Sequence, residues 1–268
     1  AGVFKEKDVT QVIMPSSVTS MGTGVFSGCS SLASVSLSTS LNSIPEDSFR
    51  ECLSLGSVAI PDSATTIASN AFYGCASLSS VSIPASVSNI STDAFSGCGN
   101  LSDISVASGN GAYASSDGCL YNASKTRLLL VPEGKTSLAI AAGTTTIGAG
   151  ALQNCTGISS VSLPNGVTTI EANAFSDSSV ETITIPATVT SIASQGSWKP
   201  STIYGASGSA AEQYAKNNGI VFVVQGNEPD PDAPGDNGNG GNDNPGNNGG
   251  TTGDNGNAGN NGNAGGNG

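Results

Sequence analysis

The sequence has no histidine and few positively charged residues: eight Lys and Arg stand against 20 Asp and Glu, so the net charge is −12 at pH 7. Without histidine, the commonest general base and the Ser-His and Cys-His catalytic pairs are excluded. The shortage of Lys and Arg argues against binding nucleic acid or an anionic membrane, since both need a surplus of positive charge. No apolar run reaches the roughly 18 residues of a membrane-spanning helix, so direct membrane insertion is not expected.

Charged residues are scarce overall, at 10% of the 268 positions, against roughly 25% in ordinary soluble domains. Hydroxyl and amide groups must therefore provide most of the polar surface. Residues 226–268 lack every large apolar side chain and consist mainly of Gly, Asn and acidic residues. Since they have nothing to bury that would offset the cost of ordering, we predict a disordered acidic linker there, and a folded domain over residues 1–225.

Cysteine is present and recurs at a strict interval of 23 residues, at Cys29, Cys52, Cys75 and Cys98. The segments between these cysteines share the pattern Cys-x2-Leu-x2-Val-x-Ile-Pro-x2-Val-x2-Ile-x3-Ala-Phe-x2-Cys, which returns at Cys155. A fixed period of roughly 20–30 residues is the sequence signature of a solenoid. The alternation of apolar and polar residues predicts a short strand in each repeat, and Pro at its end stops the pairing. We therefore predict a mainly-β, right-handed repeat solenoid with a parallel sheet.

The six cysteines allow two interpretations. Stacked Cα atoms about 4.8 Å apart lie within disulfide reach, but side chains in register point alongside each other rather than toward each other. Cysteine also behaves as a small buried hydrophobe, which favours buried thiols. No zinc site is expected, because a line of sulfur atoms is not a tetrahedron and His is missing.

An irregular stretch over residues 107–135 interrupts the period, since Cys98 and Cys155 are 11 residues further apart than two repeats require. Residues 119–121 and 128–130 are predicted to pair as a hairpin. Because insertions in solenoids often lie on the binding face, the candidate contact residues here are Tyr113, Tyr121, Lys125 and Arg127. The alternative is a decorated coil, in which the tyrosines only pack the hairpin down.

The strands also present outward positions that are short and mostly uncharged. They lack the Tyr, Trp and Arg that dominate protein-binding hot spots, but their hydroxyls could contact a flat protein surface or a glycan. The alternative is a solvated face without a partner. The candidate contact residues on the sheet are Ser36, Ser82, Ser105, Ser162 and Thr184.

The Cys-x-x-Leu starts, the Ile-Pro strand ends and the Ala-Phe-x-x-Cys closures resemble the BspA-like (Treponema-type) leucine-rich repeats of bacterial surface proteins. Residues 116–122 resemble the hairpin insert of that family, and residues 209–222 resemble its C-terminal cap, which we place over about residues 200–225. The resemblance implies a leucine-rich-repeat solenoid that is secreted or displayed on the cell surface. It further implies a role in adhesion or binding.

Three functions follow as hypotheses. The first is an extracellular, cell-surface adhesion module, a monomer that binds a host or bacterial surface protein or glycan. The second is a passive structural spacer within a larger surface protein. The third, a polysaccharide-active enzyme, needs paired carboxylates or a basic catalytic group on one face, and no such pair recurs at the 23-residue period. We therefore expect no enzyme, no catalytic residues, no cofactor and no metal site.

Overall fold

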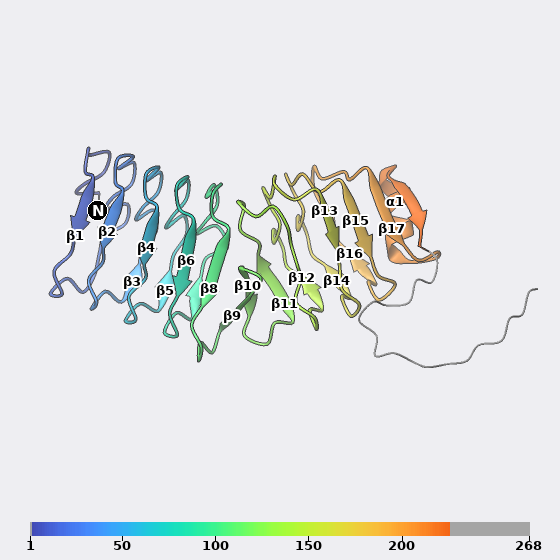
Figure 1. The fold of residues 1–268 in the computed structure, drawn as a ribbon, viewed down its shortest axis with the longest axis horizontal. Helices are drawn as coiled ribbons and strands as arrows, with labels where there is room; N and C mark the ends of the chain where they lie inside the picture. The colour runs from blue at the N-terminus through green and yellow to red at the C-terminus, as the bar shows by residue number, and fades with distance from the viewer. Residues whose placement is uncertain (1, 226–268) are drawn as a thin grey trace, which may run out of the picture. The chain divides into compact units, whose positions relative to one another are not determined.

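The computed structural model describes residues 2–225, which form a solenoid of stacked coils (Figure 1). The predicted linker over residues 226–268 lies outside the described residues. The first coils place one strand each in a parallel sheet with the order β1-β2-β4-β6-β8. Its strands are β1 (Gln11–Ile13), β2 (Ser34–Ser36), β4 (Ser57–Ala59), β6 (Ser80–Ile83) and β8 (Asp103–Val106). Their second, shorter strands form a parallel three-stranded sheet of β3 (Ser43–Ile44), β5 (Thr66–Ile67) and β7 (Asn89–Ile90).

The later coils repeat this arrangement after the insert. Another parallel sheet has the order β13-β15-β17-β18, and β12, β14 and β16 lie in parallel in a six-stranded sheet that ends in the insert. The strands are β12 (Thr146–Ile147), β13 (Ser160–Ser162), β14 (Thr169–Ile170), β15 (Thr182–Ile185), β16 (Ser191–Ile192), β17 (Thr202–Gly205) and β18 (Val221–Val224). These sheets confirm the predicted mainly-β parallel solenoid.

The register of the strands is set by the repeat. Val58 pairs with Val81 and Val81 with Ile104, so the apolar residue in the middle of each strand points into the core, above its equivalent in the next coil. Since neighbouring side chains along a strand point to opposite faces, the flanking Ser57 and Ser80 point outward, and both are exposed.

The aromatic turn of each repeat forms a stack of rings through the first coils. Phe26, Phe49, Phe72 and Phe95 lie with ring centroids 5.3–5.5 Å apart and almost parallel planes, and all four are buried. Phe4 extends the stack by one ring, at 5.4 Å from Phe26. Identical residues at one period therefore build a continuous hydrophobic column.

The recurring cysteines form a second column beside the rings. The thiol of Cys75 donates to the carbonyl oxygen of Phe49 in the preceding coil at 3.1 Å, and Cys52 and Cys98 make the equivalent bond at 3.2 and 3.1 Å. All six cysteines are buried and free, in agreement with the buried-thiol interpretation. Burial raises the pKa of the Cys52 and Cys98 thiols to about 12, so they remain neutral hydrogen-bond donors.

The insert contains the predicted hairpin and one further strand. Strand β10 (Cys119–Asn122) pairs antiparallel with β11 (Arg127–Leu130), as the sequence indicates, and also with β9 (Tyr113–Ser116), which the sequence reasoning does not predict. Strand β11 then pairs in parallel with β12 and so rejoins the regular coils.

The described chain closes with the element that resembles a cap. Helix α1 (Ala210–Asn218) begins at Ser209, whose side chain accepts a hydrogen bond from the backbone N–H of Glu212. It ends at Gly219, whose left-handed φ of 66° suits a residue without a Cβ. Its buried Ala211 and Ala215 belong to the core together with Ile203 of β17. No helix in residues 2–225 is long and apolar enough to cross a membrane.

The buried apolar residues form two clusters rather than one. The first belongs to residues 2–106, which we call the N-terminal block, and the second to residues 119–225, the C-terminal block. The two clusters meet at β10.

Candidate binding surfaces

The outward side of the two long parallel sheets is the most regular surface of the molecule. We call it the hydroxyl face. Neighbouring strands bring its hydroxyls into register, as with Ser57 beside Ser80 and Ser82 beside Ser105. Equivalent groups on adjacent strands lie about 4.8 Å apart. The hydroxyl face consists of Ser34, Ser36, Ser57, Ser80, Ser82, Ser105, Ser160, Ser162, Thr182 and Thr184.

The hydroxyls of this face are free to bind. Ser36, Ser82, Ser105 and Ser162 are exposed and Thr184 is half-buried, and none of their side-chain oxygens has a hydrogen-bond partner within residues 2–225. The face is also nearly neutral, because Asp103 is the one charged side chain among the outward positions of these strands in the described chain. It therefore offers both donors and acceptors without a strong field.

The hydroxyl face is divided in two. The first long sheet ends at β8 and the second begins at β13, and residues 131–145 between them form no strand. The N-terminal block thus carries Ser36, Ser82 and Ser105, whereas the C-terminal block carries Ser162 and Thr184.

The hairpin residues proposed as contacts are used mainly inside the protein. Tyr121 is fully buried, and its hydroxyl oxygen accepts a hydrogen bond from the backbone N–H of Ala141 at 3.1 Å. Tyr113 is half-buried, and its hydroxyl oxygen accepts from the N–H of Ile90 at 2.9 Å. A ligand cannot reach the ring of Tyr121 unless the hairpin opens, because its ring is part of the core.

Arg127 is similarly occupied, because its guanidinium donates to both carboxylate oxygens of Glu171. This hydrogen bonding holds the pKa of Glu171 below its ordinary value. Only Lys125, exposed at the turn with a φ of 56°, offers a side chain without a bond elsewhere in residues 2–225. The structure therefore does not assemble the four hairpin residues into one exposed patch.

One further surface feature escaped the sequence reasoning. The guanidinium of Arg50 lies over the ring of Tyr73, 4.4 Å from its centroid, and Leu53 in the same turn is 48% exposed. Arg and Tyr are typical of binding hot spots. The signal in the sequence was their place in the repeat, where other coils carry Ser27 and Ser96.

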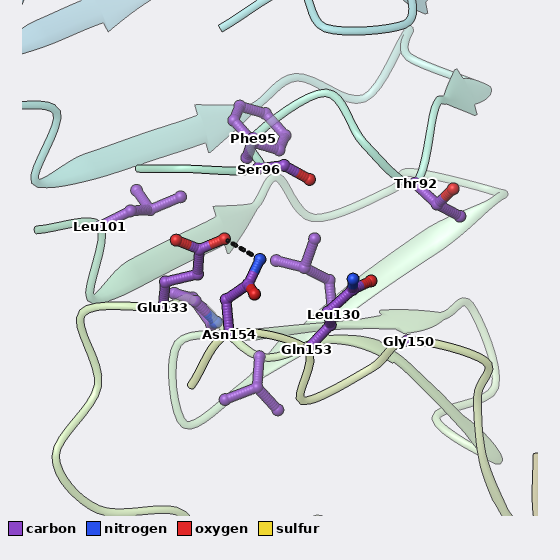
Figure 2. Close-up of a pocket in the computed structure, with 11 residues that line it drawn as sticks. Thr92, Phe95, Ser96, Leu101, Leu130, Glu133, Gly150, Gln153 and Asn154 are labelled. Carbon is purple, nitrogen blue, oxygen red and sulfur yellow. Dashed lines mark hydrogen bonds between the residues drawn. The ribbon is translucent and has the colours of Figure 1, made fainter. Parts of the chain in front are cut away.

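The described residues also contain two small hollows. A cavity of about 30 Å³ lies where Phe95 faces Glu133 and Asn154 (Figure 2), enough space for one water molecule. An open groove of about 290 Å³ lies between residues 177–181 and 197–199, at the lower end of the roughly 300–1,000 Å³ of small-molecule sites. No group of three or more His, Cys, Asp or Glu residues is placed to hold a metal ion within residues 2–225.

Stacked 23-residue coils, each with a short strand in a parallel sheet and a buried leucine, define a leucine-rich-repeat solenoid. The model of the BspA type leucine rich repeat region matches the chain in six copies, over residues 1–125 and 134–197. The chain belongs to this family.

Solved structures show the same fold. A leucine-rich repeat protein from Eubacterium ventriosum is 25% identical, with a TM-score of 0.59 over 75% of this chain and 61% of its own. A leucine-rich repeat protein from Bacteroides ovatus is 18% identical, with a TM-score of 0.51 over 81% of this chain and 61% of its own. The chain thus spans 61% of the length of each of these two proteins. No curated protein matches the chain.

Proposed function

We propose that this chain is a binding module of an extracellular, cell-surface protein, and that the hydroxyl face contacts the ligand. The observation that carries this proposal is the set of exposed, unpaired hydroxyls held in register on a rigid parallel sheet. Membership of the BspA-type family supports a binding or structural role.

The chemistry of the face favours a neutral, hydroxyl-rich partner, such as a glycan of a host cell or a neighbouring bacterium. Serine hydroxyls both donate and accept, as sugar hydroxyls do. Each net hydrogen bond contributes only about 0.5–1.5 kcal/mol, so useful affinity needs several of them along an extended ligand. A protein surface with exposed backbone or amide groups is the other partner that this face suits, and Lys125 could add a contact to either at the hairpin.

The test is a screen of the immobilised 268-residue chain against a glycan array and surface extracts, followed by titration of what binds. The variant Ser36→Ala/Ser82→Ala/Ser105→Ala removes three hydroxyls without adding bulk. We expect its dissociation constant to rise at least about tenfold, the equivalent of about 1.4 kcal/mol. The matched control is Ser40→Ala/Ser88→Ala/Ser207→Ala, which changes exposed serines away from the hydroxyl face.

Each outcome decides between the hypotheses. A ligand that the control retains and the face variant loses supports the proposal. A ligand that both variants retain moves the site away from the hydroxyl face, with Arg50 and Tyr73 as the next candidates. No ligand at all would favour the passive spacer.

A further inference from the structure

The insert builds a wall between two hydrophobic cores. Leu120 of β10 packs in the cluster of the N-terminal block, whereas its neighbours Cys119 and Tyr121 belong to the cluster of the C-terminal block. In β11, Leu128 belongs to the second cluster and Leu129 packs against the first. Since successive side chains of a strand point in opposite directions, the hairpin presents one face to each core.

The sheets break at the same place. The sheet of β3, β5 and β7 ends at β7, and the sheet that starts with β1 ends at β8. The column of stacked phenylalanines also ends here, because Phe95 is its last ring and the next ring stack, Phe175 on Trp198, lies within the C-terminal block. The regular features that couple one coil to the next are therefore interrupted together.

Side chains replace backbone groups as hydrogen-bond acceptors across this junction. Between regular coils, Phe49 and Glu51 donate their backbone N–H groups to carbonyl oxygens of the following coil, at 2.8 and 2.7 Å. At the junction, the N–H of Gly97 donates instead to the carboxylate of Glu133, and that of Ile90 to the hydroxyl of Tyr113, each at 2.9 Å.

Some direct backbone bonds remain at the junction, such as those from Ile104 N–H to Gly118 O and from Gly134 N–H to Leu101 O, each at 2.8 Å. The cavity in Figure 2 lies beside them, between Phe95 and Glu133, and the carboxylate of Glu133 also accepts from the side-chain amide of Asn154 at 3.3 Å. Packing is thus incomplete where Glu133 bridges the two blocks.

We propose that the insert divides the solenoid into two cooperative units that unfold separately, with the junction between the N-terminal and C-terminal blocks as the point of parting. In a solenoid each coil is stabilised by its own residues and by its interface with its neighbours, so partial unfolding stops at the weakest interface. One block then keeps its part of the hydroxyl face after the other has opened.

The test is hydrogen exchange of the 268-residue chain, followed by mass spectrometry over a series of urea concentrations. We expect peptides of the N-terminal block to share one unfolding midpoint and peptides of the C-terminal block to share a different one. A single midpoint for all peptides of residues 2–225 would overturn the proposal.

A junction variant sharpens the test. Tyr113→Phe removes the acceptor of the Ile90 N–H and keeps the ring. If the blocks are separate units, only the less stable block loses its contribution from the interface, so its midpoint falls while that of the other block is unchanged. If the solenoid were one unit, every peptide would shift equally, which would also overturn the proposal.

The matched control is Tyr73→Phe, because the hydroxyl of Tyr73 has no hydrogen-bond partner within residues 2–225. It should leave both midpoints unchanged. A second pair of variants separates bonding from packing: Glu133→Ala should lower the midpoint of the less stable block, and Glu133→Gln, which keeps an acceptor for the Gly97 N–H, should restore most of it. Equal shifts of both blocks in Glu133→Ala would contradict two units.

Discussion

The two blocks of the solenoid solve the same stacking problem in different ways. The N-terminal block repeats identical residues, so its rings and its thiols each form an unbroken column. The C-terminal block varies the same positions, with Leu152, Phe175 and Trp198 in turn at the aromatic position. It adds the Arg127–Glu171 ion pair and helix α1. Strict repetition stabilises a coil through its neighbours alone, whereas varied coils need additional interactions.

The largest expected effect tests the ring column. Phe72 lies between Phe49 and Phe95 and is fully buried, so Phe72→Ala leaves a cavity with a ring on each side. We predict a loss of about 3–5 kcal/mol in the free energy of unfolding of the N-terminal block. Leu152→Ala in the C-terminal block should cost less, because the removed side chain is smaller. Urea denaturation measures both, and an equal or larger loss for Leu152→Ala would mean that the column contributes nothing beyond ordinary burial.

The next effect concerns the thiol column. Cys75→Ser shortens the side chain and removes the bond to the Phe49 carbonyl, so a loss of about 2 kcal/mol is expected. The chain itself contains the equivalent serine: Ser178 follows Cys155 by 23 residues, and its buried side-chain oxygen has no hydrogen-bond partner within residues 2–225. Thermal denaturation of Cys75→Ser is the measurement, and an unchanged midpoint would show that the thiols are passive filler.

The reverse substitution should stabilise the C-terminal block. Ser178→Cys places the longer thiol at a position where the other coils use it, and it removes an unsatisfied buried hydroxyl. We predict a gain of about 1 kcal/mol, measured by the thermal midpoint with Ser179→Cys as the control, since Ser179 is exposed. If Ser178→Cys destabilises the protein, the one-residue shorter loop of this coil has closed the space.

A smaller effect tests the ion pair that only the C-terminal block has. Hydrogen bonding from Arg127 lowers the pKa of Glu171 below its ordinary 4.5 in the folded protein. The pair therefore adds stability at pH values above about 4.5, and this contribution is lost as the pH falls through the lower, folded pKa. Glu171→Gln should cost about 1 kcal/mol at pH 7 and flatten the loss of stability at acid pH. Unfolding curves from pH 7 to pH 3 would show an unchanged acid slope if the pair were not involved.

The repeat made much of this fold predictable. Val81, Ile83 and Phe95 recur at one period, and a period that contains strand alternation and a terminal Pro leaves little freedom in how coils stack. The hairpin was predictable in its pairing but not in its orientation. The burial of Tyr121 depends on which face of β10 meets the second core, and the sequence contains no period there.

The candidate site was predictable only in part. The outward direction of Ser82 and Ser105 follows from alternation along the strand, and both are exposed as expected. The engagement of Arg127 with Glu171 was not predictable, because the two residues are 44 positions apart and meet only through the parallel pairing of β11, β12 and β14. Long-range pairs of this kind depend on register, which local sequence does not specify.

The most direct test of the binding role compares the two halves of the hydroxyl face with one ligand from the screen. The N-terminal variant is Ser36→Ala/Ser82→Ala/Ser105→Ala, and the C-terminal variant is Ser162→Ala/Thr184→Val. Since the N-terminal serines are exposed and Thr184 is half-buried, we predict that the first variant weakens binding at least about tenfold and the second less. Unchanged dissociation constants for both variants would contradict the hydroxyl face as the binding surface.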